Sequence, residues 1–185
     1  MGIRTNELMK SYLIDFDFYE TIETNGQPQL ESLKNSLPDK LVELIDLPIL
    51  EDTNGNYLIN INRNKKWVNE GEEIDDYSNF VDQTGFECDH NKINLWDYQP
   101  NMEEYMKDHE LWAASFLKQG LYFSLLLFNK ISAIEGRVFK VIFSYGLSKF
   151  VDSVIRFHSL RIGESYIPDD FEKMSFVQGI LTIDK

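Results

Sequence analysis

Cysteine is almost absent from this chain, and long apolar runs are absent as well. Cys88 is the single cysteine among 185 residues, so no internal disulfide can form and zinc modules built on four cysteines are excluded. The longest apolar run, Leu121–Phe128 with one serine inside it, is far shorter than the roughly 20 residues that span a bilayer. Residues 1–10 lack the apolar stretch of a signal peptide. We therefore expect a soluble cytoplasmic protein that does not contact a membrane.

The familiar catalytic motifs are missing too. No two of the ten glycines stand close enough for the phosphate-binding loops of nucleotide enzymes. Ser144 lacks the preceding glycine of a nucleophile elbow. His109 and Glu110 begin like the zinc motif HExxH, but Ala113 stands where the second histidine is required. We therefore predict no catalytic residue from motifs and no cofactor.

Cys88, Asp89 and His90 form the densest group of potential metal ligands. A zinc site needs three or four ligands at fixed geometry, and neither His109 nor His158 stands at a spacing that would complete one. A nucleophilic thiol is the other interpretation, but the neighbouring carboxylates would raise the pKa of Cys88 and disfavour the thiolate. We expect no bound metal here.

The hydrophobic pattern predicts an α+β fold with an antiparallel sheet. Apolar residues make up 43% of the chain and aromatic residues 14%, enough to build a core. Strands that pair antiparallel with each other are predicted at Arg137–Tyr145 and Asp152–Ile162, which are rich in valine, isoleucine and phenylalanine. Helices within about residues 101–131 are expected to pack on one face of the sheet, with a break at Gly120. Because no linker divides the sequence, residues 1–185 are expected to form one domain.

Two local predictions concern the first part of the chain. In Ser11–Tyr19 apolar and polar residues alternate, which predicts a half-buried strand with Asp15 and Asp17 on its solvent face. In residues 49–61, Asn54-Gly55 separates two apolar runs, which is the sequence of a hairpin closed by a two-residue type I′ turn.

Acidic residues are concentrated in the same part of the chain. The net charge is −13, and residues 1–110 hold 24 Asp or Glu against 9 Lys or Arg, whereas residues 111–185 hold 7 against 9. Residues 70–89 contain eight acids and no base. Such a field repels nucleic acid and anionic lipid, and it speeds the encounter with a basic protein. The alternative interpretation is a solvated acidic loop that keeps the protein soluble.

Aromatic side chains among these acids favour a binding surface. Aromatic residues at the centre of an interface supply much of the binding energy, and charges around them set the association rate. We therefore predict that this segment binds a basic protein through the following side chains: Glu70, Glu72, Glu73, Asp75, Asp76, Tyr77, Phe80, Asp82, Phe86 and Glu87.

The resulting hypothesis is a small acidic protein-binding module. Its composition is similar to that of bacterial immunity proteins, which block a cognate toxin nuclease by covering its cationic surface, although no sequence motif carries the similarity. Two alternatives stay open at this point. One is an enzyme with a dispersed site around His158, Asp15 and Asp17. The other is a structural subunit whose acidic part only confers solubility.

Overall fold

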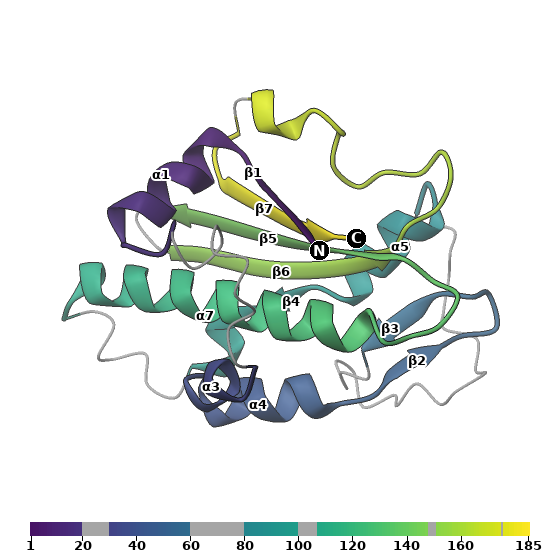
Figure 1. The fold of residues 1–185 in the computed structure, drawn as a ribbon, viewed down its shortest axis with the longest axis horizontal. Coiled ribbons are helices and arrows are strands. Elements are labelled where there is room, and N and C mark those ends of the chain that lie inside the picture. The colour runs from purple at the N-terminus through teal and green to yellow at the C-terminus, as the bar shows by residue number, and fades with distance from the viewer. Residues whose placement is uncertain (20–29, 60–79, 100–106, 148–150, 175) are drawn as a thin grey trace.

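The structure is a computed structural model that describes residues 1–19, 30–59, 80–99, 107–147, 151–174 and 176–185. These residues form the α+β fold that the sequence predicts, with a five-stranded antiparallel sheet, a two-stranded sheet and several helices (Figure 1). The two-stranded sheet consists of β2 (Ile49–Glu51) and β3 (Tyr57–Ile59).

The five-stranded sheet is assembled from distant parts of the chain. Its order is β1-β7-β5-β6-β4, with the bounds Gly2–Thr5, Gly179–Asp184, Phe139–Leu147, Val151–Ser159 and Ile93–Asn94. After β4 the chain enters the 3-10 helix η2 (Leu95–Tyr98). The predicted pairing of the two C-terminal strands is confirmed, because β5 and β6 pair antiparallel over their whole length. Since β7 pairs with the other edge of β5, the C-terminal third of the chain builds the centre of the sheet.

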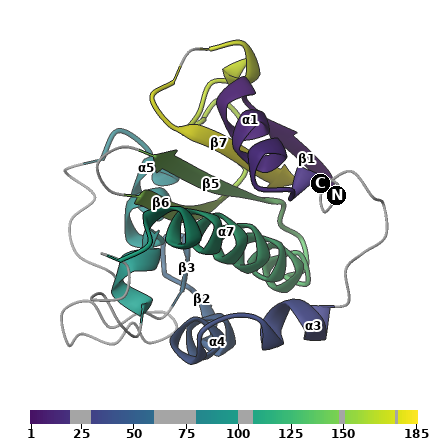
Figure 2. The ribbon, with the colours of Figure 1, turned by 90° about the vertical axis from the view of Figure 1, so that its left-hand side faces the viewer.

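Helix α7 (His109–Ile131) covers one face of this sheet and forms the main core with it (Figure 2). Its buried leucines and phenylalanines pack against sheet residues such as Val141, Phe143 and Ile155. By length and composition α7 could cross a membrane, but 67% of its most apolar stretch is buried inside the protein. It is therefore the core helix of a soluble domain.

The predicted break at Gly120 is wrong, because α7 continues through this residue without interruption. Helix propensity favours ending a helix at a glycine, but tertiary packing decides the matter here. A Cβ atom placed on Gly120 would lie 2.1 Å from Cζ of Phe143 on β5. The close approach of helix and sheet thus requires a residue without a side chain.

The predicted helical region begins in residues 100–106, which lie outside the described residues. Helix α7 starts after Asp108, and the side chain of Asp108 caps it.

Two short helices form a further layer beneath α7, on the side away from the sheet (Figures 1 and 2). They are α3 (Leu30–Asn35) and α4 (Asp39–Asp46), and both contact α7. Lys130 of α7 donates hydrogen bonds to the carbonyl oxygen of Ile45, at 2.6 Å, and to that of Leu47. A cation from α7 therefore satisfies carbonyl groups at the end of α4.

The strand predicted at Ser11–Tyr19 is wrong, because helix α1 (Glu7–Asp15) begins before this segment and runs into it. Met9 and Leu13 stand four residues apart and are fully buried. Ile14, which a period of two places in the core, is 56% exposed. The helical spacing that starts at Met9 therefore outweighs the alternation, and Asp15 and Asp17 do not share the face of a strand.

The predicted hairpin is confirmed, but its turn is of a different type. Of the two residues Asn54 and Gly55, only Gly55 has a positive φ, of 76°, whereas a type I′ turn requires two such residues. The carboxylate of Asp52 accepts backbone hydrogen bonds from Asn54 at 2.9 Å and from Asn56 at 2.8 Å. This carboxylate stabilises a wider turn than the one predicted.

The other face of the sheet is covered by the segment between β6 and β7, which includes the 3-10 helix η3 (Phe171–Lys173). The guanidinium of Arg4 on β1 holds this segment, since it lies 5.1 Å from the ring centre of Phe171 and pairs with Glu172 at 3.0 Å. The segment closes a second, smaller apolar cluster that consists of Cys88, Ile142, Ile167, Phe171 and Ile180.

We predict that Gly120→Ala destabilises the protein. The methyl group would collide with Phe143, and overpacking of this kind costs about 1–3 kcal/mol, more than the roughly 1 kcal/mol that alanine gains over glycine in a helix. Thermal unfolding measures the effect. The double variant Gly120→Ala/Phe143→Leu is the control, since a smaller side chain at 143 should restore part of the loss. A Gly120→Ala variant as stable as the wild type would contradict the packing described here.

Candidate partner-binding surface

The described part of the predicted binding segment contains helix α5 (Gln83–His90), whereas the weak periodicity of residues 70–89 indicated a loop with a helical turn. Asp82 caps this helix by accepting a hydrogen bond from the backbone N of Gly85 at 2.7 Å. Phe80 and Asp82 are partly exposed. Phe86 and Glu87 are fully buried, so they belong to the interior and present no surface to a partner. The remaining predicted residues lie outside the described residues: Glu70, Glu72, Glu73, Asp75, Asp76 and Tyr77.

The buried carboxylate of Glu87 accepts hydrogen bonds from three residues that lie far from it along the chain. The backbone N of Tyr57 on β3 donates at 2.7 Å, and that of Ser159 on β6 donates at 2.6 Å. The guanidinium of Arg161 donates twice, at 2.8 and 3.0 Å. Burial alone would lower the pKa of Arg161, but the hydrogen bond and the charge of Glu87 outweigh it and raise the pKa above its usual value. Arg161 therefore stays a cation, and it forms an ion pair inside the protein with one of the predicted surface acids.

Asn91, which ends α5, extends the same network. Its side-chain amide donates to the carbonyl oxygens of Tyr57, at 2.8 Å, and Phe157, at 3.1 Å, and it accepts from the backbone N of Ile59 at 2.9 Å. Glu87 and Asn91 are four residues apart and so share one face of the helix. Together they join backbone groups of β3 to backbone groups of β6, as an intervening strand would.

Phe80 packs on α5. Its ring centre lies 5.4 Å from that of Phe86, with the rings perpendicular, and 5.8 Å from that of His90. The rings of Phe86 and His90 are themselves 4.0 Å apart. This stacking gives Phe80 a structural role and leaves only part of its side chain available to a partner.

The residues of the alternative enzyme site lie apart. His158 is 1% exposed and pairs across the sheet with Lys140 on β5. Asp15 ends α1, and a tyrosine of that helix packs edge-on against Tyr145, with ring centres 5.1 Å apart. Lys140 and Tyr145 are five residues apart on one strand, which corresponds to about 17 Å. The structure thus places His158 and Asp15 near opposite ends of β5. Asp15 and Asp17 are both exposed, whereas His158 is buried.

Cys88 is buried, and its surroundings disfavour the thiolate that a nucleophile or a metal ligand requires. Burial raises the pKa of the Cys88 thiol far above its usual range, which disfavours the thiolate. Cys88 lies in the small apolar cluster, whereas the ring of His90 stacks on Phe86. In the part of the chain that the structure describes, no group of three His, Cys, Asp or Glu side chains is placed to hold a metal ion.

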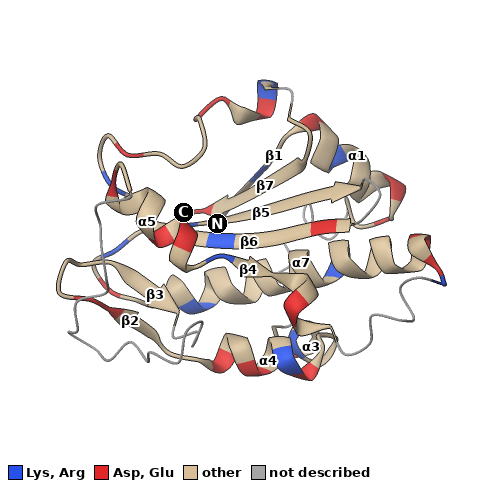
Figure 3. Ribbon diagram, turned by 180° about the vertical axis from the view of Figure 1, so that it is seen from behind, with Lys and Arg blue, Asp and Glu red and all other residues tan. Residues whose placement is uncertain are grey.

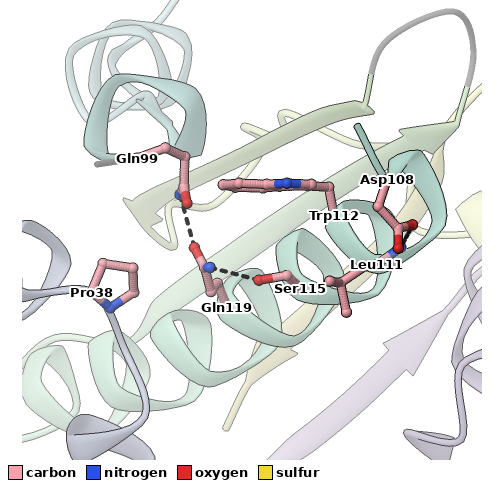
Figure 4. A pocket seen from close by; sticks show the side chains of 7 residues that line it. All are labelled: Pro38, Gln99, Asp108, Leu111, Trp112, Ser115 and Gln119. Atoms are coloured by element: carbon pink, nitrogen blue, oxygen red, sulfur yellow. Dashed lines mark hydrogen bonds between the residues drawn. The ribbon is translucent and has the colours of Figure 1, made fainter. Parts of the chain in front are cut away.

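A cavity of about 540 Å³ opens between α4 and the start of α7 (Figure 4). The amide of Gln99 donates to Gln119 at 2.8 Å, and Gln119 donates to the hydroxyl of Ser115 at 2.9 Å. The indole of Trp112 and the side chain of Leu111 form the apolar part of the wall. The described lining residues are amides, a hydroxyl, a capping carboxylate and apolar groups.

Sequence reasoning missed Arg161, Ser159 and Asn91, which hold α5 in place. Arg161 lies 74 residues from Glu87 along the chain, so no local pattern connects the two. The one available signal was the excess of acids around Glu87, and this signal points to the surface instead of the interior.

We predict that Glu87→Gln strongly destabilises the protein. The substitution leaves the Arg161 guanidinium, which is 16% exposed, without its anion, and breaking a buried ion pair in this way costs about 3–5 kcal/mol. Denaturant unfolding gives the value. Asp46→Asn is the matched control, because the Lys34–Asp46 pair is largely exposed and should contribute at most about 1 kcal/mol. Equal costs for the two substitutions would contradict the role assigned to Glu87.

A second prediction concerns the pH dependence of stability. Burial lowers the pKa of His158, against the opposing effect of the hydrogen bond to the carbonyl oxygen of Ser159. The folded protein therefore binds a proton at His158 less readily than the unfolded chain, so folding stability is lost as the pH falls below about 6.5, the usual histidine value. His158→Leu should flatten this decline in denaturant unfolding between pH 7 and 5. An identical slope in variant and wild type would refute the assignment.

Comparison with known proteins identifies one family. No curated protein and no solved structure matches the chain. The model of the Uncharacterized protein PM0498 family matches residues 23–185, which include every described element except β1 and α1. The chain therefore belongs to the Uncharacterized protein PM0498 family.

Proposed function

We propose that this protein is a cytoplasmic binding module that neutralises a basic protein partner, as bacterial immunity proteins neutralise a cognate toxin such as a nuclease. The observation that carries the proposal is the distribution of charge: residues 1–110 hold 24 acids against 9 bases, and residues 70–89 hold eight acids and no base. A field of this kind attracts a cationic surface and accelerates association.

The described residues support a binding role in two ways. Acidic residues lie on α5, as Figure 3 shows, and Asp89 on this helix is exposed. The titratable residues that could have formed a dispersed catalytic site, His158 with Asp15 and Asp17, lie apart. A rigid scaffold that carries an acidic segment is the arrangement expected of an inhibitor that covers a cationic surface.

The decisive test is binding kinetics with a basic protein encoded beside this gene. Changing Glu72, Glu73, Asp75 and Asp76 together to their amides should slow association and flatten its dependence on salt, because these charges steer the encounter. Tyr77→Ala should instead speed dissociation by the equivalent of about 1–3 kcal/mol, as truncation of an interface anchor does. Stopped-flow or surface measurements at two salt concentrations give both rates.

A matched control separates this segment from general charge. The four exposed acids on α3 and α4 are Glu31, Asp39, Glu43 and Asp46, and changing them to amides alters the net charge by the same amount. If both fourfold variants slow association equally, the net charge and not residues 70–76 attracts the partner. If neither changes the association rate, the acidic segment serves solubility only.

A further inference from the structure

Two apolar side chains are fully exposed on segments that are linked by hydrogen bonds between Glu164 and Thr84. Ile162 is 107% exposed and Val81 is 103% exposed, relative to a fully solvated residue. Single exposed apolar residues are common on soluble proteins, but neighbouring ones are less so and often mark a binding site. Ile162 lies in the turn after β6, and Val81 directly precedes the residue that caps α5.

The turn that carries Ile162 is fixed at both of its ends. It is closed by a hydrogen bond from the backbone N of Glu164 to the carbonyl oxygen of Arg161 at 3.3 Å, and Gly163 adopts a φ of 82°. On one side Arg161 is bound to the buried Glu87. On the other side the carboxylate of Glu164 accepts hydrogen bonds from the backbone N and the hydroxyl of Thr84, at 2.9 and 2.8 Å.

The hairpin turn is locked to the same place. Gln83 of α5 donates to the carbonyl oxygen of Asn54 at 2.9 Å, and Arg161 donates to that of Gly55 at 3.2 Å. Hydrogen bonds therefore join three segments into one unit, which we name the α5 corner: residues 52–56, 81–84 and 161–164. Because its backbone is held by hydrogen bonds, little conformational entropy is lost when the corner binds another surface.

The charge of the α5 corner is negative around the exposed apolar pair. Asp82 and Glu164 form no ion pair with the described residues. Two cations lie at the corner, and each has an anion: Arg161 is paired with Glu87, and Arg137, which lies beside Gly55, is paired with Glu51 at 3.7 Å. An apolar centre with an acidic surround is complementary to an apolar recess ringed by lysine and arginine.

We propose that Ile162 and Val81 are the apolar anchors with which this protein holds its basic partner. The inference rests on the proposed function and adds to it a second contact surface, the α5 corner. The acidic segment sets the rate of encounter, and the α5 corner sets the rate of dissociation, since desolvated apolar contacts at the centre of an interface dominate the residence time.

The test places a photo-cross-linking amino acid at position 162 in the full chain, in the cells that express it. Position 177 is the matched control, because Val177 is also exposed, at 96%, but lies in another part of the molecule. Its neighbour Gln178 contacts Asp152, at the end of β6 opposite to the turn that carries Ile162. Position 76, within the acidic segment, is the third site. We expect one adduct, with a protein whose isoelectric point is above about 9, from positions 162 and 76 and not from 177.

The cross-linked protein is then purified and its affinity measured. Ile162→Ser should weaken binding at least about tenfold through faster dissociation, while Val177→Ser leaves it unchanged and both variants keep the wild-type melting temperature. An adduct from position 76 alone, or equal affinities of wild type and Ile162→Ser, overturns the anchor and leaves the proposed function standing. The lack of a basic adduct from all three positions overturns both.

Discussion

The arrangement of the two sheets depends on the polar side chains of Glu87 and Asn91, one helical turn apart on α5. They bind backbone groups of Tyr57 and Ile59 on β3 and of Phe157 and Ser159 on β6. Burying a carboxylate is costly unless it is paired and hydrogen-bonded, and Arg161 supplies the missing charge. The position of the hairpin, of α5 and of the turn after β6 thus follows from one ion pair and one amide.

This internal pairing also determines what the outside of the molecule presents. The direct ion pair of Arg161 is with the buried Glu87, so Asp82 and Glu164 remain without an ion pair among the described residues. The α5 corner therefore stays acidic although a guanidinium lies beneath it. The same hydrogen bonds that stabilise the fold hold Ile162 out in solvent on a fixed turn. Stability of the core and presentation of an apolar side chain have one physical cause.

The sequence predicted those features that depend on local pattern. The fold class, the C-terminal strand pair and the existence of the 49–61 hairpin were all readable from β-branched runs and turn residues. Long-range packing produced the errors. Gly120 continues a helix because Phe143 needs its space, and α1 is helical because Met9 begins a four-residue spacing that the later alternation hides. Glu87 resembled a solvated acid because its cation is 74 residues away.

Chain connectivity links the two halves of the proposed binding surface. Asp76 and Val81 are five positions apart, and an extended chain of that length spans at most about 18 Å. The last carboxylates of the acidic segment are therefore tethered near the α5 corner, within about two Debye lengths at physiological salt. In the proposed complex, charges at this range guide a cationic surface toward the corner but hold it weakly. Lasting attachment requires contacts that exclude water, and at the α5 corner Ile162 and Val81 are the fully exposed apolar side chains available to make them.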